Sequence, residues 1–361
     1  MKGIDFKIIE DLWLQKIWKN NETFNLYIDN PFCVNKCKFC VHFGEKAAIG
    51  STQYNKYYDE LLPQQLFQYR KILNSRKIDS LYLGGGTPSL MTASKMKEVF
   101  ELIPDIKNIK YKHFEAHPAF LTKEKMDILA EYGFKYISIG IQTLDKEINE
   151  YNSRTLMSNL KLKEITNYIQ KEKKMHVNID LLAYIYRNCS DNRDPCHIVS
   201  NDITYLADEI KPDFITIYSM YQAFNINFYC SNLDALSGEQ IVEDLEKIVN
   251  LRRTLLKVCR SRSEYRVWGM TENTFLNRDA IKKNLLSDVY LTRLADSEVD
   301  SIRSYNCSSY PYQPQSQNTI GIGGQVRRVY SYMGKSLYYD SVINDGKIQY
   351  FIRTNDLGVK L

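Results

Sequence analysis

Residues 27–40 read YIDNPFCVNKCKFC and place three cysteines, Cys33, Cys37 and Cys40, on a short loop after an apolar run. The run FNLYID at 24–29 is typical of a buried strand, and the cysteine spacing is C-x3-C-x2-C. Three thiolates on one loop can bind three irons of a cubane cluster and leave the fourth iron open for another ligand. This loop is therefore the candidate metal centre of the chain.

A structural zinc site is the main alternative for the same cysteines. His42 lies two residues after Cys40, so it is available as the fourth ligand of a Cys3His tetrahedron. The rest of the sequence favours the iron–sulfur interpretation, because a zinc knuckle does not need a long series of strands and helices behind it.

Strands and helices alternate along the chain. Apolar runs predict six strands, at 24–29, 79–86, 112–117, 136–142, 176–183 and 214–220. Amphipathic stretches predict helices at 54–73, 94–102, 123–132, 160–171, 199–210 and 238–258. Six strand-then-helix units require parallel strands with helical crossovers, so the predicted fold class is α/β, a partial TIM-like barrel of the (β/α)6 type. Such sheets bind ligands at the carboxyl ends of their strands.

The alternation suggests three parts. We expect an N-terminal extension over 1–22, the partial barrel over 23–260 and a C-terminal region over 261–361. The last region is rich in Tyr, Ser and Asn and lacks a clear alternation, so it is predicted to be a small, irregular α/β portion that covers the substrate at the barrel mouth.

Composition limits the classes of partner. With 361 residues, 44% hydrophobic and 25% charged, the chain has the makeup of a globular protein. The net charge of +5 is spread along the chain, which does not predict nucleic-acid binding, and no apolar run is long enough for a membrane span. A spaced cysteine cluster fits the cytoplasm, where thiols stay reduced. We interpret the five other cysteines as scattered thiols, at 189, 196, 230, 259 and 307.

The cysteine segment resembles the radical S-adenosylmethionine (SAM) signature of the oxygen-independent coproporphyrinogen III oxidase-like family, which includes heme chaperones and class C radical SAM methyltransferases. Further motifs follow in the family's order: LGGGTPSL at 83–90, EAHP at 115–118, GFKYISIGIQTLD at 133–145, NIDLLA at 178–183 and IGIGG at 320–324. The resemblance implies a radical SAM partial barrel and a [4Fe–4S] cluster held by the three cysteines.

The resemblance also implies the contacts of a cluster-bound SAM. Tyr27 would contact SAM and Phe39 would pack beside its adenine. The polar ends of SAM would be bound by Glu115 and Arg154, the arginine through paired hydrogen bonds to the carboxylate. The backbone residues expected near the methionyl amino group are Gly84, Gly85 and Thr87.

A second SAM is implied in the same way. Gln142 and Asp180 would contact a ribose or this second molecule, and the turn at Gly321 and Gly323 would bind it together with Gln142. Gln142 is also the candidate catalytic residue. The implied enzyme cleaves SAM to a 5′-deoxyadenosyl radical and transfers a methyl or methylene carbon to a small-molecule natural product. Its electron donor would be a flavodoxin or ferredoxin.

Several of these residues also have a purely structural explanation. The glycines at 84–86 are also what a tight turn needs, Asp180 is also interpretable as a buried, hydrogen-bonded carboxylate, and Arg154 as a surface helix residue.

Two other functions stay open on the same scaffold. One is hydrogen abstraction with oxidative decarboxylation or rearrangement, and the other is heme trafficking without turnover. The sequence departs from the family pattern at Asp29, where a histidine is usual, and at His42, where heme-pathway oxidases carry a fourth cysteine. It also lacks an HNxxYW motif. These departures disfavour a porphyrin substrate.

Overall fold

The computed structural model describes residues 4–14, 23–40, 45–183, 185, 192–219, 253, 257, 261, 265–268, 273–277, 318–323, 329–333, 337–344 and 347–355. The chain divides into two compact units. The first comprises Met1–Val34, Val41–Ile137 and Val289–Leu361, and the second comprises Asn35–Cys40 and Ser138–Asp288. The cysteine loop therefore contributes residues to both units.

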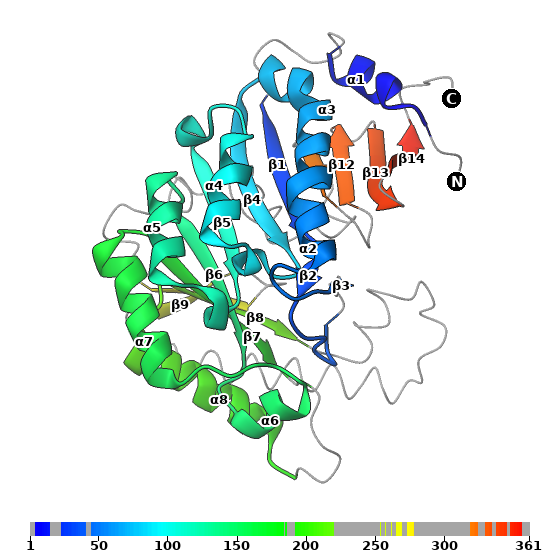
Figure 1. Ribbon diagram of the computed structural model, residues 1–361. Helices are drawn as coiled ribbons and strands as arrows, with labels where there is room; N and C mark the ends of the chain where they lie inside the picture. Colours follow the sequence, from blue (N-terminus) through cyan, green and yellow to red (C-terminus); the bar gives the residue numbers. More distant parts are fainter. Residues whose placement is uncertain are drawn as a thin grey trace. The chain divides into compact units, whose positions relative to one another are not determined.

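The first unit is built on a sheet whose central strands are parallel (Figure 1). β1 (Phe24–Asn30) pairs in parallel with β4 (Ile78–Gly85) on one side and with β11 (Asn318–Ile322) on the other. β4 in turn pairs in parallel with β5 (Tyr111–Ala116). The strands beyond β11 are antiparallel to their neighbours and are β12 (Val329–Met333), β13 (Leu337–Asn344) and β14 (Lys347–Asn355).

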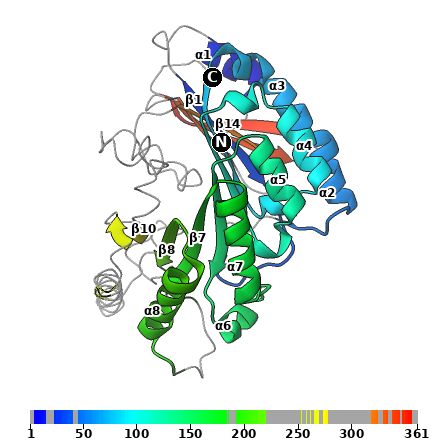
Figure 2. The ribbon, with the colours of Figure 1, turned by 90° about the vertical axis from the view of Figure 1, so that its left-hand side faces the viewer.

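Helices cover one face of these strands, as Figures 1 and 2 show for α3, α4 and α5. Side-chain oxygens of Ser51, Thr92 and Thr122 cap α2, α4 and α5 by accepting from a backbone N–H in the first turn. The helices are α1 (Phe6–Leu14), α2 (Thr52–Lys56), the π-helical turn η1 (Tyr57–Leu61), α3 (Leu62–Ser75), α4 (Ala93–Glu101) and α5 (Lys123–Glu131). Short 3₁₀ turns are η2 (Pro88–Leu90), η3 (Ile106–Asn108) and η4 (Pro118–Phe120).

Burial alternates along β5 and separates its two faces. Lys112, Phe114 and Ala116 are buried, whereas the alternate residues His113 and Glu115 are only half-buried. Because successive side chains of a strand point to opposite faces, His113 and Glu115 share the face opposite Phe114. This half-buried face carries Glu115, which the resemblance assigns to SAM.

The second unit has its own strands and helices. β7 (His176–Ala183) and β8 (Phe214–Ser219) are parallel, and β10 (Asn273–Asn277) is antiparallel to both β8 and β9 (Tyr265–Trp268). Its helices are α6 (Lys146–Tyr151), α7 (Asn159–Asn167), the π-helical turn η5 (Tyr168–Glu172), α8 (Pro195–Tyr205) and the π-helical turn η6 (Leu206–Ile210). β6 (Tyr136–Gln142) begins in the first unit, continues in the second, and stands between β5 and β7 in the strand order.

The predicted α/β fold class is confirmed. The six predicted strands correspond to β1, β4, β5, β6, β7 and β8, and together with β11 they make a parallel stretch of seven strands. Five predicted helices correspond to α3, α4, α5, α7 and α8 with their adjoining turns. The sixth, at 238–258, lies outside the described residues except for 253 and 257.

The C-terminal region is more regular than its sequence suggests, because β11 to β14 extend the sheet. Tyrosine is common in strands, so the Tyr-rich composition that lacks a helical alternation suits these antiparallel strands. The division into parts at residues 22 and 260 stays a prediction. None of the helices in the described part of the chain has the length and apolarity needed to cross a membrane.

Candidate active site

The cysteine loop begins where β1 ends. Cys33 closes the two-residue strand β2 (Phe32–Cys33), which pairs in parallel with β3 (Glu45–Lys46) in the first unit. In the second unit the Cys40 N–H donates to the Cys37 carbonyl at 3.0 Å, so these two cysteines share a tight turn. All three are cysteines of intermediate burial that are not in disulfides, and a cysteine thiolate is the usual ligand of an iron–sulfur cluster.

Hydrogen-bond donors point at two of the three sulfurs. Within the first unit Thr87 Oγ1 donates to Cys33 Sγ at 3.4 Å, and within the second Arg154 Nη1 donates to Cys37 Sγ at 3.8 Å. Donors of this kind also contact the ligand sulfurs of metal sites, where they orient the ligands. Across the described residues, no three His, Cys, Asp or Glu side chains are already assembled as a metal-binding group. The chemistry of the three thiols and their donors fits a cysteine-bound iron–sulfur cluster.

The glycine turn after β4 contacts the end of β1 backbone to backbone. Gly85 has a φ of 106°, and a Cβ there would lie 2.5 Å from the Asn30 carbonyl oxygen and 2.6 Å from Asp29 Oδ1. Gly86 N–H donates to the Asn30 carbonyl at 2.6 Å, and a Cβ on Gly86 would lie 3.0 Å from Cys33 Sγ. Only glycine permits this approach. The segment is therefore a tight turn that also packs directly against Cys33 and the end of β1.

Gly321 and Gly323 lie on the other side of β1. Gly321 opposes Tyr27 in the parallel register, and Gly323 has a φ of 108° and donates its N–H to Gln65 Oε1 at 2.7 Å. A Cβ on Gly323 would lie 2.5 Å from the Asp29 carbonyl oxygen. Within the first unit, the structure therefore places these glycines beside Tyr27 and Asp29. Gln142 belongs to the second unit, so their joint contact with a second SAM stays a prediction.

Gln142 ends β6 in a left-handed conformation, with a φ of 75°. Positive φ is uncommon outside glycine and is found at functional sites more often than elsewhere. Arg154 Nη2 donates to the carbonyl of Gly140, and a Cβ on Gly140 would lie 2.9 Å from Gln142 Nε2 and 3.2 Å from Arg154 Nη2. Arg154 lies in the turn after α6 and is half-buried, which argues against a surface role.

Phe39 and Asp180 are anchored separately in the second unit. Phe39 is buried with Ile148 and Ile185, and Cys37 and Cys40 pack against this cluster. The Asp180 carboxylate accepts from Asn178 Nδ2 at 2.7 Å. The structural interpretation of Asp180 as a satisfied carboxylate therefore has direct support, while its contact with a ribose stays a prediction.

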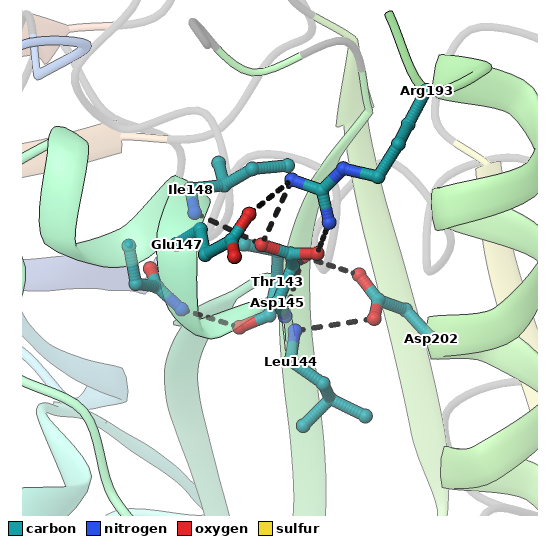
Figure 3. A network of polar contacts seen from close by, with 8 residues as sticks. Thr143, Leu144, Asp145, Glu147, Ile148, Arg193 and Asp202 are labelled. Atoms are coloured by element: carbon teal, nitrogen blue, oxygen red, sulfur yellow. Dashed lines mark hydrogen bonds and ion pairs between the residues drawn. The ribbon is translucent and has the colours of Figure 1, made fainter. Parts of the chain in front are cut away.

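A polar network fixes the turn that follows Gln142 (Figure 3). Asp202 on α8 accepts from Thr143 Oγ1 at 2.6 Å and from Leu144 N at 3.2 Å. Asp145 accepts from Ile148 N at 2.9 Å, which caps α6, and forms an ion pair with Arg193. Burial raises the pKa of Asp202 to about 7, an effect that outweighs the two hydrogen bonds.

The sequence did not single out several residues that the structure places at the site. Tyr82 donates its hydroxyl to Glu115, Asn178 bonds Asp180, and Gly140 makes room for Arg154 and Gln142. Gly140 was predictable as a site residue, because a glycine inside a predicted strand often marks the close approach of another group. Tyr82 and Asn178 carried none beyond the alternation of their strands.

Residues 27–182 match the model of the Radical SAM superfamily. This range contains the three cysteines, the glycine turn and Glu115, and it also contains Gln142, Arg154 and Asp180. Membership of this superfamily implies a [4Fe–4S] cluster and SAM as cofactors.

Two curated proteins are similar to part of the chain. The chain is 28% identical over 227 residues to the heme chaperone HemW of Buchnera aphidicola subsp. Schizaphis graminum, which covers 61% of this chain and 57% of HemW. It is 30% identical over 141 residues to the oxygen-independent coproporphyrinogen-III oxidase-like protein HemZ of Bacillus subtilis, which covers 36% of this chain and 27% of HemZ. The chain thus matches little more than half of HemW and about a quarter of HemZ.

The fold is similar to that of coproporphyrinogen III oxidase HemN from Escherichia coli, with a TM-score of 0.66 and 16% identity over 97% of this chain and 76% of HemN. This likeness confirms the predicted partial radical SAM barrel. The family model and the two relatives support a radical SAM domain over residues 27–182 that is similar to the oxygen-independent coproporphyrinogen III oxidase-like proteins of that superfamily.

Proposed function

We propose that this chain cleaves SAM reductively to methionine and a 5′-deoxyadenosyl radical, with a [4Fe–4S] cluster held by Cys33, Cys37 and Cys40. When bound, the cluster supplies one electron to the SAM sulfonium, and the bond from sulfur to C5′ breaks. The observation that carries this proposal is the pair of hydrogen bonds onto the Cys33 and Cys37 sulfurs, on a loop that places Cys40 in one turn with Cys37.

The surrounding side chains suit the charges of SAM. In the first unit Glu115 offers a carboxylate acceptor for an ammonium or hydroxyl group, beside the backbone of Gly84 and the ring of Tyr27. In the second unit the Arg154 guanidinium, fixed by the Gly140 carbonyl, offers donors that match a carboxylate. We propose that Glu115 and Arg154 bind the polar ends of SAM, as the resemblance implies.

Replacing single cysteines tests the cluster. After anaerobic reconstitution, Cys33→Ala and Cys37→Ala should lose the thiolate-to-iron absorption, most of the bound iron and the formation of 5′-deoxyadenosine. Cys196→Ala is the matched control, because Cys196 is also a free thiol of intermediate burial but lies on α8. A Cys37→Ala protein with full iron and full 5′-deoxyadenosine formation would refute the proposal, and zinc in place of iron in the native protein would favour the zinc alternative.

For the step after cleavage we propose hydrogen abstraction from a tetrapyrrole-class substrate. The similarity to an oxidase-like protein supports this choice, and we give it more weight than the departures from the family pattern at Asp29 and His42. The radical would take a hydrogen atom from the substrate and become 5′-deoxyadenosine. The substrate radical would then lose carbon dioxide and pass one electron to an acceptor. Formation of a decarboxylated product from coproporphyrinogen III, with 5′-deoxyadenosine in equal amount, tests this step.

Heme binding is the second candidate function, and the match to a heme chaperone over 61% of the chain favours it. Titration of the protein with heme, followed by the Soret band, tests this candidate directly. Saturable binding of one heme without turnover of coproporphyrinogen III would select the chaperone function over the oxidase function.

Methyl transfer from a second SAM stays a prediction, and neither HemW nor HemZ carries a name that supports it. Methyl-deuterated SAM distinguishes it from hydrogen abstraction. Methyl transfer requires deuterium in 5′-deoxyadenosine, S-adenosylhomocysteine as a co-product and a labelled carbon in the product, whereas hydrogen abstraction from the substrate gives none of these.

The proposed reaction also sets requirements for its surroundings. It needs a one-electron donor of low potential, for which we propose a flavodoxin or ferredoxin, and it needs reduced cysteines. We propose the cytoplasm as its compartment, because thiols stay reduced there.

A further inference from the structure

Three side chains of the first unit converge on Gly84. A Cβ at this position would lie 2.7 Å from Tyr82 Cε1, 3.1 Å from Glu115 Oε2 and 3.1 Å from Tyr27 Cε2. A real Cβ essentially never approaches another heavy atom as closely as 2.7 Å, so two rings and a carboxylate occupy the space that any other residue would need. Gly84 is therefore where the end of β4 meets the carboxylate expected to bind SAM.

Tyr82 lies directly below this point on the same face of the sheet. It opposes Tyr27 on β1 and His113 on β5 in the parallel register, and Glu115 follows His113 by two residues on the same face. The Tyr82 hydroxyl donates to Glu115 Oε1. Tyr27, Tyr82 and His113 thus form one row of rings across three strands, and the hydroxyl of Tyr82 in this row contacts the Glu115 carboxylate.

The neighbouring rings hold Tyr82 in this orientation. The Tyr82 ring centroid lies 5.7 Å from that of Tyr27 and 4.6 Å from that of His113, and Tyr82 is 3% exposed. His113 is half-buried as a residue, but its imidazole is desolvated, which lowers the pKa of His113 to about 3 and leaves the ring uncharged at neutral pH. The Tyr82 hydroxyl is the donor that fixes Oε1 of the carboxylate.

We propose that Tyr82 is a positioning residue for Glu115: its hydroxyl holds one carboxylate oxygen, so that the other faces the Gly84 backbone and the bound SAM. The inference rests on the proposed function, since it assigns Glu115 to SAM. Tyr82 itself acts through Glu115 and does not touch the nucleotide.

A double-mutant cycle on the cluster-reconstituted protein tests this inference. The dissociation constant of SAM is measured anaerobically by equilibrium dialysis for Tyr82→Phe, Glu115→Ala and the double variant, together with iron content and melting temperature. Tyr82→Phe should weaken SAM binding roughly threefold to tenfold, because one charge-assisted hydrogen bond is lost. Tyr111→Phe is the control, because Tyr111 is a half-buried tyrosine on the face of β5 that carries Glu115, and this variant should bind SAM like the wild type.

The double variant decides the mechanism. If Tyr82 acts through Glu115, the double variant binds SAM as Glu115→Ala alone does, with iron content unchanged in all four proteins. Independent, multiplicative losses would overturn the inference, and so would a Tyr82→Phe protein with unchanged affinity beside a weakened Glu115→Ala protein. An unchanged affinity in Glu115→Ala would instead overturn the proposed SAM site.

Discussion

Arg154 donates from Nη1 to the sulfur of Cys37 at 3.8 Å. The same guanidinium donates from Nη2 to the carbonyl of Gly140. One side chain therefore links Cys37, a proposed cluster ligand, to the strand that ends at Gln142, within the second unit.

Arg154→Ala should weaken SAM binding while the cluster still assembles. The three thiolates remain, so iron content should stay near that of the wild type. The loss of a charged hydrogen bond of about 1.5–3 kcal/mol predicts a SAM affinity about tenfold to hundredfold lower. Arg193→Ala is the control, because its exposed ion pairs with Asp145 and Glu147 contribute little. Equal SAM affinity in both variants, measured by equilibrium dialysis, would show that Arg154 does not bind SAM.

Gly140→Ala should disturb Arg154 and Gln142 together. Its Cβ would lie 2.9 Å from Gln142 Nε2 and 3.2 Å from Arg154 Nη2, so both side chains must shift. We expect weaker SAM binding and a lower melting temperature. Gly50→Ala is the control, because a Cβ on Gly50 meets nothing within 4 Å and tests only its φ of +79°. A Gly140→Ala protein with wild-type SAM affinity would mean that these two side chains do not contact the cofactor.

Asp202→Asn should change how stability depends on pH. The pKa of Asp202 is about 7 in the folded protein and near 3.8 in the unfolded chain. Between these values the folded state holds a proton that the unfolded state releases. This group therefore lowers the free energy of unfolding as the pH rises from about 4 to about 7, by at most on the order of 4 kcal/mol, and adds no further change above that.

Denaturant unfolding of the cluster-free protein at pH 5, 6, 7 and 8 measures this effect. The stability of the wild type relative to Asp202→Asn should decrease from pH 5 to pH 8. Asp194→Asn, at the exposed N-cap of the same helix, should follow the wild-type profile. A relative stability that is independent of pH would contradict the assignment of a raised pKa to Asp202.

Lys125→Met should destabilise the first unit. The buried Lys125 ammonium donates to the Ser89 carbonyl at 2.7 Å and to the Phe120 carbonyl at 2.9 Å, and so ties the turn after β4 to the turn after β5. Methionine fills the space but leaves both carbonyls without this donor, at a cost of about 1–3 kcal/mol for each buried group. Lys123→Met, exposed on the same helix, should change the free energy of unfolding by less than about 0.5 kcal/mol.

The cysteine loop and the strand–helix series were predictable from the sequence because each depends on local spacing. The contacts that connect them were not. Tyr82 reaches Glu115 only through the register of β4 against β5, and Lys125 reaches Ser89 across two turns. Neither pairing has a periodicity of its own, so residue patterns predict the elements and leave these side-chain partners undetermined.

The C-terminal strands illustrate the same limit in another way. Their tyrosines and serines show no helical periodicity. The parallel pairing of β11 with β1 joins segments that lie far apart in the sequence, so no local pattern predicts it. The left-handed Gln142 was also beyond prediction, since it is not a residue type that favours positive φ.

The pairing of β1 with β11 has a consequence for biosynthesis. β1, β4 and β5 are synthesised before β6 to β10, and the strand that occupies the other edge of β1 follows all of these strands. Until then β1 presents an unpaired edge, which is a template for aggregation, and the close approach of Gly323 to Asp29 does not exist. The nascent chain therefore carries Cys33 through the synthesis of all these strands before Gly323 can reach Asp29, so we expect cluster insertion to follow the pairing of β11 with β1.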